Sequence, residues 1–166
     1  MFCDVEDAGM NEYRRVVREW LDREDWSGWY AVTATLRDYD LNLLGEEEYV
    51  NERHAIRNVR HFLNRLNRFC FGKSAQRYGH KVEVIPCFEY GGSNNRLHLH
   101  FFIKKPNHIP EWKFLLKVSS CWTQTRWGAL SMVIKKNTDS GWLEYITKDT
   151  RRSFENVDFE NIWVTG

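Results

Sequence analysis

The sequence lacks the marks of a secreted, membrane-bound or disulfide-stabilised protein. Its N-terminus is acidic, without the apolar core of a signal peptide, and no apolar run reaches the roughly 18 residues that a membrane span needs. The 4 cysteines are scattered and form no Cys-x-x-Cys pair, which argues against a disulfide framework or a cysteine zinc cluster. We therefore expect a cytoplasmic protein, nuclear if its source has a nucleus, with no membrane partner.

Internal repeats and low-complexity segments are also missing. The chain has 166 residues, 15% of them aromatic, which suits a packed domain with a proper core and not a disordered protein. We expect an N-terminal helical extension over residues 1–28, with helical spacing at 10–22, and one domain over residues 29–166.

A large net charge is absent as well, since the formal value is +1, but the charges are unevenly distributed. Residues 1–50 carry 13 acidic and 5 basic side chains, and residues 51–81 carry 8 basic and 1 acidic. Residues 104–152 carry 10 basic and 4 acidic. A polyanion could lie along this basic half. For the 51–81 run, a solvated helix surface is an equally good interpretation.

Apolar periodicity and breaker residues predict the order helix, β, α, β, β, α, β, α. After the first helix come a strand at 29–37, a loop at 38–44, a helix at 46–70, strands at 81–90 and 97–103 joined by a turn, a helix at 111–122, a strand at 130–135 and a helix at 140–151, with a short strand possible at 161–165. Trp112, Leu115 and Leu116 are assigned to the apolar side of the 111–122 helix. Pro86 indicates an edge strand or a bulge. The predicted fold class is α+β: a central antiparallel sheet backed by helices, in the split βαβ arrangement of ferredoxin-like and RRM-like domains.

Two histidines mark the 97–103 strand. Because side chains alternate, His98 and His100 share one face, with Cα atoms about 6.5–7 Å apart, and the apolar residues between them face the core. Glu89 lies on the preceding strand, and a hairpin brings it across from the histidines. Two imidazoles and a carboxylate suit Mn²⁺ or Mg²⁺ and leave positions for water or substrate. Ordinary polar residues on a strand surface are the other interpretation.

A tyrosine and a lysine share one face of the last predicted helix. Tyr145 and Lys148 are three residues apart. A tyrosine can act as a covalent nucleophile, but at a pKa near 10 only about one in 1,000 is ionised at pH 7, so it needs a cation or a base. Lys148 could stabilise the phenolate or a phosphate oxygen, or protonate a leaving group. An ordinary helix tyrosine is the alternative.

These motifs resemble the HUH endonucleases that initiate rolling-circle replication, of the single-tyrosine Rep type. In that family's order the sequence has an apolar threonine strand at 32–36, His98-Leu99-His100 with Glu89 upstream, and Tyr145-Ile146-Thr147-Lys148. The resemblance covers about residues 29–150. It implies that Glu89, His98 and His100 hold the metal. It also implies that Tyr145 attacks single-stranded DNA at a replication origin, giving a 5′-phosphotyrosyl enzyme and a free 3′-OH.

The resemblance also implies DNA contacts and further replication partners. Besides origin DNA, these would be host replication proteins or a helicase. The predicted DNA contacts are Thr33, Thr35, Arg53, Arg57, Arg60, Lys104, Lys105, Lys135, Lys136 and Arg151. Many viral Reps carry a helicase motif, Gly-x-x-x-x-Gly-Lys-[Ser/Thr], and this sequence has none. We therefore expect either an isolated nuclease domain or a small initiator from a mobile element.

Three other functions stay open. A small tyrosine transposase shares the histidine pair and the tyrosine, although the Tyr-x-x-Lys motif and the threonine strand favour an initiator. A non-catalytic nucleic-acid-binding module of the same fold needs no metal. A non-haem iron oxygenase also uses two histidines and a carboxylate, but its barrel takes about eight strands, for which three predicted helices leave too little chain.

Overall fold

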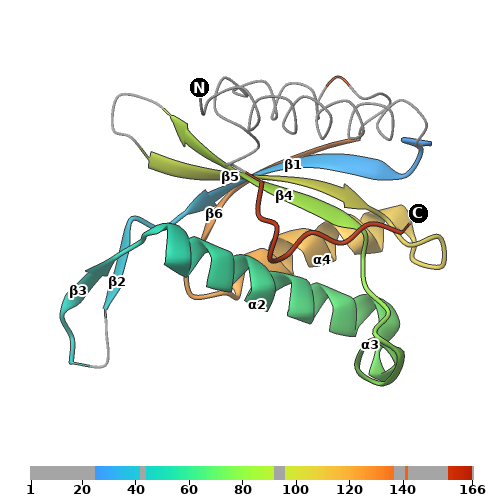
Figure 1. Cartoon of the computed structure of the whole chain (residues 1–166), viewed down its shortest axis with the longest axis horizontal. Helices are drawn as coiled ribbons and strands as arrows, with labels where there is room; N and C mark the ends of the chain where they lie inside the picture. The colour runs from blue at the N-terminus through green and yellow to red at the C-terminus, as the bar shows by residue number, and fades with distance from the viewer. Residues whose placement is uncertain (1–24, 42–43, 92–95, 137–140, 142–156, 166) are drawn as a thin grey trace, which may run out of the picture.

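The described part of the chain is built on a four-stranded antiparallel sheet with helices on one face (Figure 1). A computed structural model describes residues 25–41, 44–91, 96–136, 141 and 157–165. In chain order the elements are β1 (Trp29–Leu36), β2 (Tyr39–Leu41), β3 (Glu47–Tyr49), α2 (Glu52–Phe71), α3 (Lys73–Tyr78), β4 (Val84–Gly91), β5 (Arg96–Lys104), α4 (Glu111–Thr123) and β6 (Gly128–Lys136). The sheet order is β4-β5-β1-β6, and every neighbouring pair is antiparallel. This order, with α2 and α4 as the crossovers, is the split βαβ arrangement, so the predicted fold class is confirmed.

The four predicted strands of the sheet are found, with ends that differ by up to three residues. The strand with Pro86, β4, lies at an edge of the four-stranded sheet, as predicted. Proline has no N–H to donate, and an edge position tolerates that loss. The Pro86 carbonyl still accepts a hydrogen bond, from the Asp158 N–H at 2.9 Å.

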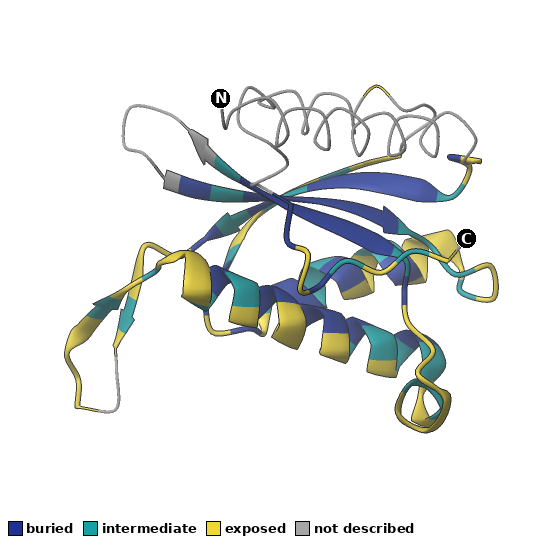
Figure 2. Ribbon diagram, viewed as in Figure 1, coloured by how far each residue is buried: buried dark blue, intermediate teal, exposed yellow. Residues whose placement is uncertain are grey.

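The main core lies between the sheet and the helices α2 and α4 (Figure 2). The apolar side predicted for α4 is wrong. Trp112 is 66% exposed and Leu116 63% exposed, and Leu115 is only partly buried. The side chains that face the core follow the spacing i, i+4, i+7, i+8, which keeps them on one stripe of the helix. They are Phe114, Val118, Cys121 and Trp122.

The long helix begins later than predicted, because residues 46–48 belong to a β-ribbon. In the ribbon of β2 and β3, Asp40 lies opposite Glu48, and Arg126 binds both carboxylates, at 2.8 and 2.7 Å. The guanidinium of Arg126 lowers the pKa of Asp40. Asn51 then caps α2: its side-chain oxygen accepts a hydrogen bond from the His54 N–H at 2.9 Å. Such a cap contributes about 1 kcal/mol and fixes where the helix starts.

A buried polar lock joins α2 to the turn before β6. The Asn58 side chain donates to the Thr125 hydroxyl at 2.9 Å and accepts from the Trp127 N–H at 3.0 Å. The next residue, Gly128, starts β6 against this turn. A Cβ atom there would lie 2.1 Å from the Trp122 carbonyl oxygen, so only glycine fits without a shift of backbone.

The face of the sheet opposite the helices is apolar at one end. Phe102 of β5 stacks on Trp29 of β1, with ring centroids 4.8 Å apart and an angle of 15°. Together with Trp26, Ile85, Cys87 and Val157 they form a second buried cluster. The expectation that β5 carries core residues on one face only is therefore wrong for its second half, which is buried on both faces.

The segment 157–164 closes the edge of β4. Two isolated bridges join it to the strand, Val84 to Trp163 and Cys87 to Val157, where a short strand was predicted at 161–165. The segment continues across to α2, where the Asn161 side chain donates to the Ile56 carbonyl at 3.1 Å (Figure 1, red).

Two smaller findings complete the fold. Residues 73–78 form the short helix α3, within a stretch that the sequence analysis left without an element. Cys70, Cys87 and Cys121 are free and buried, as expected for ordinary thiols. Within the described ranges, no helix is both long and apolar enough to cross a bilayer. The predicted helix at 10–22, and all but Gly141 of the one at 140–151, lie outside these ranges.

Candidate active site

The two histidines of β5 lie in the middle of a polar row that crosses three strands. In the register of the sheet, His98 pairs with Glu89 of β4 on one side and Thr35 of β1 on the other. His100 pairs with Thr33 of β1. Directly paired residues project to the same face of a sheet. All five side chains therefore share one face, as predicted for the histidines and Glu89.

This face is the one turned away from α2 and α4. The residues that alternate with the histidines, Leu97, Leu99 and Phe101, are part of the core beneath the helices. His100 is itself buried, with 6% of its surface exposed, whereas His98 is half-buried. The site is thus a partly covered polar row on a sheet whose other side is fully packed.

The His100 ring is held at both of its nitrogens. Its Nε2 lies 2.5 Å from Oε2 of Glu89, and its Nδ1 lies 3.1 Å from the Thr33 hydroxyl. A carboxylate can only accept, so Nε2 carries a proton and donates to Glu89, and the hydroxyl of Thr33 donates to Nδ1. The hydroxyl can also accept, so it can serve the other tautomer equally well.

The residues present fit a divalent cation in their chemistry and partly in their arrangement. Two of the three predicted donor atoms, on Glu89 and His100, already converge, and Nε2 would become a ligand by losing one proton. Thr33 would then accept the Nδ1–H, the kind of outer contact that orients metal-binding histidines. In the described part of the chain, no three His, Cys, Asp or Glu side chains form a complete ligand group. His98 would have to turn toward the pair.

A family comparison bears on what this site does. The sequence model of the family described as replication-associated protein ORF2 matches residues 29–154, about three quarters of the chain. The chain belongs to this family. The matched range contains the threonine strand, the histidine strand and the segment with Tyr145. No curated protein and no solved structure matches the chain. Membership of this replication-associated family indicates a role in DNA replication and, with it, contact with DNA.

The predicted lysines of this replication-associated protein lie in different surroundings. Lys135 pairs with Ala31 in the sheet and is exposed on the histidine face, whereas Lys136 projects to the helix face. Lys104 binds Glu83 at 3.4 Å. Lys105 donates to two backbone carbonyls, at 3.1 and 3.0 Å, and so holds the loop that follows β5.

The three arginines predicted to contact DNA lie on α2, on the other side of the sheet. Arg53, Arg57 and Arg60 are exposed, and Arg60 binds Glu160 at 2.6 Å. A DNA strand bound at the histidine face of this replication-associated protein would have to pass round an edge of the sheet to meet them. Tyr145, Lys148 and Arg151 lie outside the described residues.

The contact between Thr33 and His100 is the feature that sequence reasoning missed, because both threonines were assigned to DNA. A signal for it was present. A split βαβ order places the first strand beside the third, so Thr33-x-Thr35 and His98-x-His100 lie on neighbouring strands with matching alternation. Across that pair, a threonine next to a histidine is the expected outcome.

Proposed function

We propose that this chain is a metal-dependent endonuclease that nicks and rejoins single-stranded DNA to initiate rolling-circle replication. The contact of His100 with Glu89, with His98 across the strand pair, is the observation that carries the proposal. Membership of the replication-associated family supports an initiator over a transposase. An open four-stranded sheet in the described residues, in place of a barrel, favours this reading over an oxygenase.

The proposed reaction is a transesterification. The Tyr145 oxygen attacks the phosphorus of a scissile phosphodiester as its proton leaves, forming the Tyr145–phosphate bond. The bond from phosphorus to the 3′ oxygen breaks, and Lys148 gives that oxygen a proton. The products are a 5′-phosphotyrosyl protein and a 3′-OH that can prime synthesis. Because a phosphodiester is exchanged for a phosphodiester, the reverse reaction rejoins strands without ATP.

Glu89, His98 and His100 would hold a Mn²⁺ or Mg²⁺ ion. The ion supplies electrostatic stabilisation of the phosphate oxygens when it is bound. In this proposal Thr33 has no direct contact with DNA. It keeps the His100 ring in the plane in which Nε2 faces Glu89.

The test is the formation of a covalent adduct. Wild-type protein is incubated with Mn²⁺ and a labelled pool of single-stranded DNA that contains a randomised segment, and then run on a denaturing protein gel. We expect a labelled band at the mass of protein plus DNA, and sequencing of the bound DNA gives the target. Tyr145→Phe should abolish the band, and Glu89→Gln should raise the Mn²⁺ concentration for half-maximal adduct at least about tenfold.

Matched variants separate chemistry from general damage. Tyr78→Phe changes an exposed tyrosine on α3, and His61→Ala an exposed histidine on α2, so both should form the adduct at the wild-type rate. If wild-type protein forms no adduct with any pool member, although it binds Mn²⁺ and single-stranded DNA, the endonuclease proposal is wrong. A passive binding module then becomes the better reading.

A further inference from the structure

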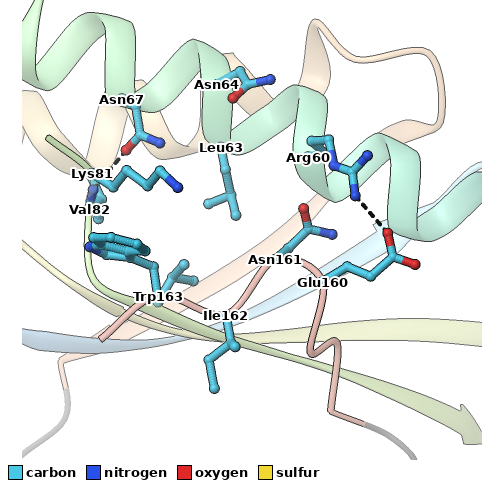
Figure 3. A pocket seen from close by; sticks show the side chains of 11 residues that line it. Arg60, Leu63, Asn64, Asn67, Lys81, Val82, Glu160, Asn161, Ile162 and Trp163 are labelled. Atoms are coloured by element: carbon cyan, nitrogen blue, oxygen red, sulfur yellow. Dashed lines mark hydrogen bonds and ion pairs between the residues drawn. The ribbon is translucent and has the colours of Figure 1, made fainter. Parts of the chain in front are cut away.

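A small polar cavity lies on the helix side of the sheet, away from the histidine row. It has a volume of about 200 Å³ and lies between α2, the start of β4 and the segment 157–164 (Figure 3). Its lining includes Arg60, Asn64 and Asn67 of α2, Lys81 before β4, and Trp163. Pockets that enclose a drug-sized ligand measure about 300–1,000 Å³. This cavity therefore suits a single ring and not a whole cofactor.

An aromatic ring and a cation form one wall. Trp163 is 38% exposed, and its backbone is fixed because its N–H and carbonyl both bond to Val84, at 2.9 and 2.6 Å. The Lys81 ammonium lies 4.3 Å from the centre of the Trp163 ring. An aromatic face with a mobile cation beside it suits a nucleobase with its phosphate, since the base stacks on the ring and the ammonium moves to the phosphate.

Side-chain amides form the opposite wall. Asn67 accepts a hydrogen bond from the Val82 N–H at 2.7 Å, which fixes the amide and leaves its NH₂ group to donate into the cavity. Asn64 is exposed on the same side of α2, and Figure 3 shows both amides above the Trp163 ring. An amide offers a donor and an acceptor together, as the edge of a base requires. The only anionic lining residue is Glu160, which Arg60 neutralises.

The cavity is within reach of DNA held at the histidine row. Val84 lines the cavity and Glu89 lies five residues along the same strand, about 17 Å away. A single strand that leaves the histidine face and passes round the edge of the sheet at β4 would need only a few nucleotides to arrive there. Beyond the cavity it would meet the exposed arginines of α2.

We propose that this cavity binds one nucleotide of the single-stranded DNA substrate, several positions from the scissile phosphate, with the base on Trp163 and the phosphate on Lys81. The site extends the proposed function, on which it rests, because it makes the origin strand bend round the β4 edge. It also gives the arginines of α2 a role in binding phosphates further along the same strand.

The first test is the dependence of affinity on DNA length. Oligonucleotides that carry the target are extended one nucleotide at a time on each side of the scissile position, and their Kd for the Tyr145→Phe protein is measured by fluorescence anisotropy. We expect a rise in affinity of about five- to 100-fold at one length and on one side only. Lys81→Glu and Trp163→Ala should remove this step and leave binding of the shortest oligonucleotide unchanged.

Matched controls come from α4. Lys113 is also an exposed lysine near an aromatic ring, and Trp112 is an exposed tryptophan outside the cavity. Lys113→Glu and Trp112→Ala should keep the step at its full size. Because Lys81 is exposed, Lys81→Glu tests the site even if Trp163→Ala disturbs the packing of its segment.

Photocrosslinking locates the nucleotide directly. 5-Iododeoxyuridine at the position that gives the step should crosslink to Trp163, and Lys81→Glu should weaken the crosslink. A step of unchanged size in Lys81→Glu and Trp163→Ala, or crosslinks everywhere except Trp163, would overturn the inference. Failure of the endonuclease proposal looks different: wild-type protein forms no adduct even with short oligonucleotides, whatever the length dependence of binding.

Discussion

The hydroxyl of Thr33 is the most direct point at which to test how the candidate site is built. We predict that Thr33→Val weakens Mn²⁺ binding and that Thr33→Ser does not. Valine has nearly the shape of threonine, so it fills the same space between the strands. What it removes is the partner of His100 Nδ1, 3.1 Å away on a ring that is 6% exposed.

The size of the effect follows from the two states of the ring. With the cation bound, Nδ1–H would donate to Thr33 from a ring polarised by the ion, and a hydrogen bond to a charged group contributes about 1.5–3 kcal/mol. Without the cation, the hydroxyl donates to a neutral ring, which contributes about 0.5–1.5 kcal/mol. The difference is about 1–1.5 kcal/mol, or a five- to tenfold rise in the Mn²⁺ Kd, since 1.4 kcal/mol is a factor of ten.

Isothermal titration with Mn²⁺ measures the Kd, and urea unfolding of the metal-free proteins measures the other half of the argument. Metal-free Thr33→Val should be less stable than wild type by about 1 kcal/mol. A Thr33→Val protein that binds Mn²⁺ within twofold of wild type, while showing the loss of stability, would refute a role for Thr33 in orienting the ligand. Equal losses in Thr33→Ser would show that packing, and not the hydroxyl, matters.

Three further predictions concern the fold. Asn58→Ala should lower the free energy of unfolding by about 3 kcal/mol, because two buried hydrogen bonds are lost, and urea unfolding with an unchanged midpoint would contradict this. Gly128→Ala should cost about 1–3 kcal/mol in the same assay, because its Cβ meets a backbone oxygen; a neutral effect would mean that the turn yields easily. Burial raises the pKa of the Cys70 and Cys87 thiols to about 12, so at pH 8 only about one in 10,000 is thiolate. Iodoacetamide should therefore label them only after unfolding, and rapid labelling of native protein would disprove it.

The sheet could be predicted from the sequence because its strands have strong local signals. The histidine strand is apolar, unbroken and preceded by a turn, and the antiparallel hairpin with Glu89 follows from these features alone. The position of Pro86 at an edge follows from the missing N–H. The fold class follows from the order of the elements, which leaves few arrangements of the sheet.

The errors arose where tertiary contacts outweigh the local pattern. Residues 46–48 look like an acidic first helical turn, but Arg126, almost 80 residues away, binds Glu48 and stabilises a ribbon in its place. In α4, two apolar stripes compete, and only the position of the sheet decides that Phe114, and not Trp112, is buried. The Thr33 contact and the cavity at Trp163 depend on segments distant in sequence, so no local pattern reveals them.

The closing of the β4 edge by residues 157–164 has a consequence for how the protein is made. Val84 leaves the ribosome 79 residues before Trp163, its partner in the bridge. At about 5–20 residues per second, the outer edge of β4 stays without this cover for roughly 4–16 s of synthesis. An open edge is a template for pairing with another chain. Pro86, which interrupts the row of N–H donors at that edge, makes such pairing less favourable until the end of the domain arrives.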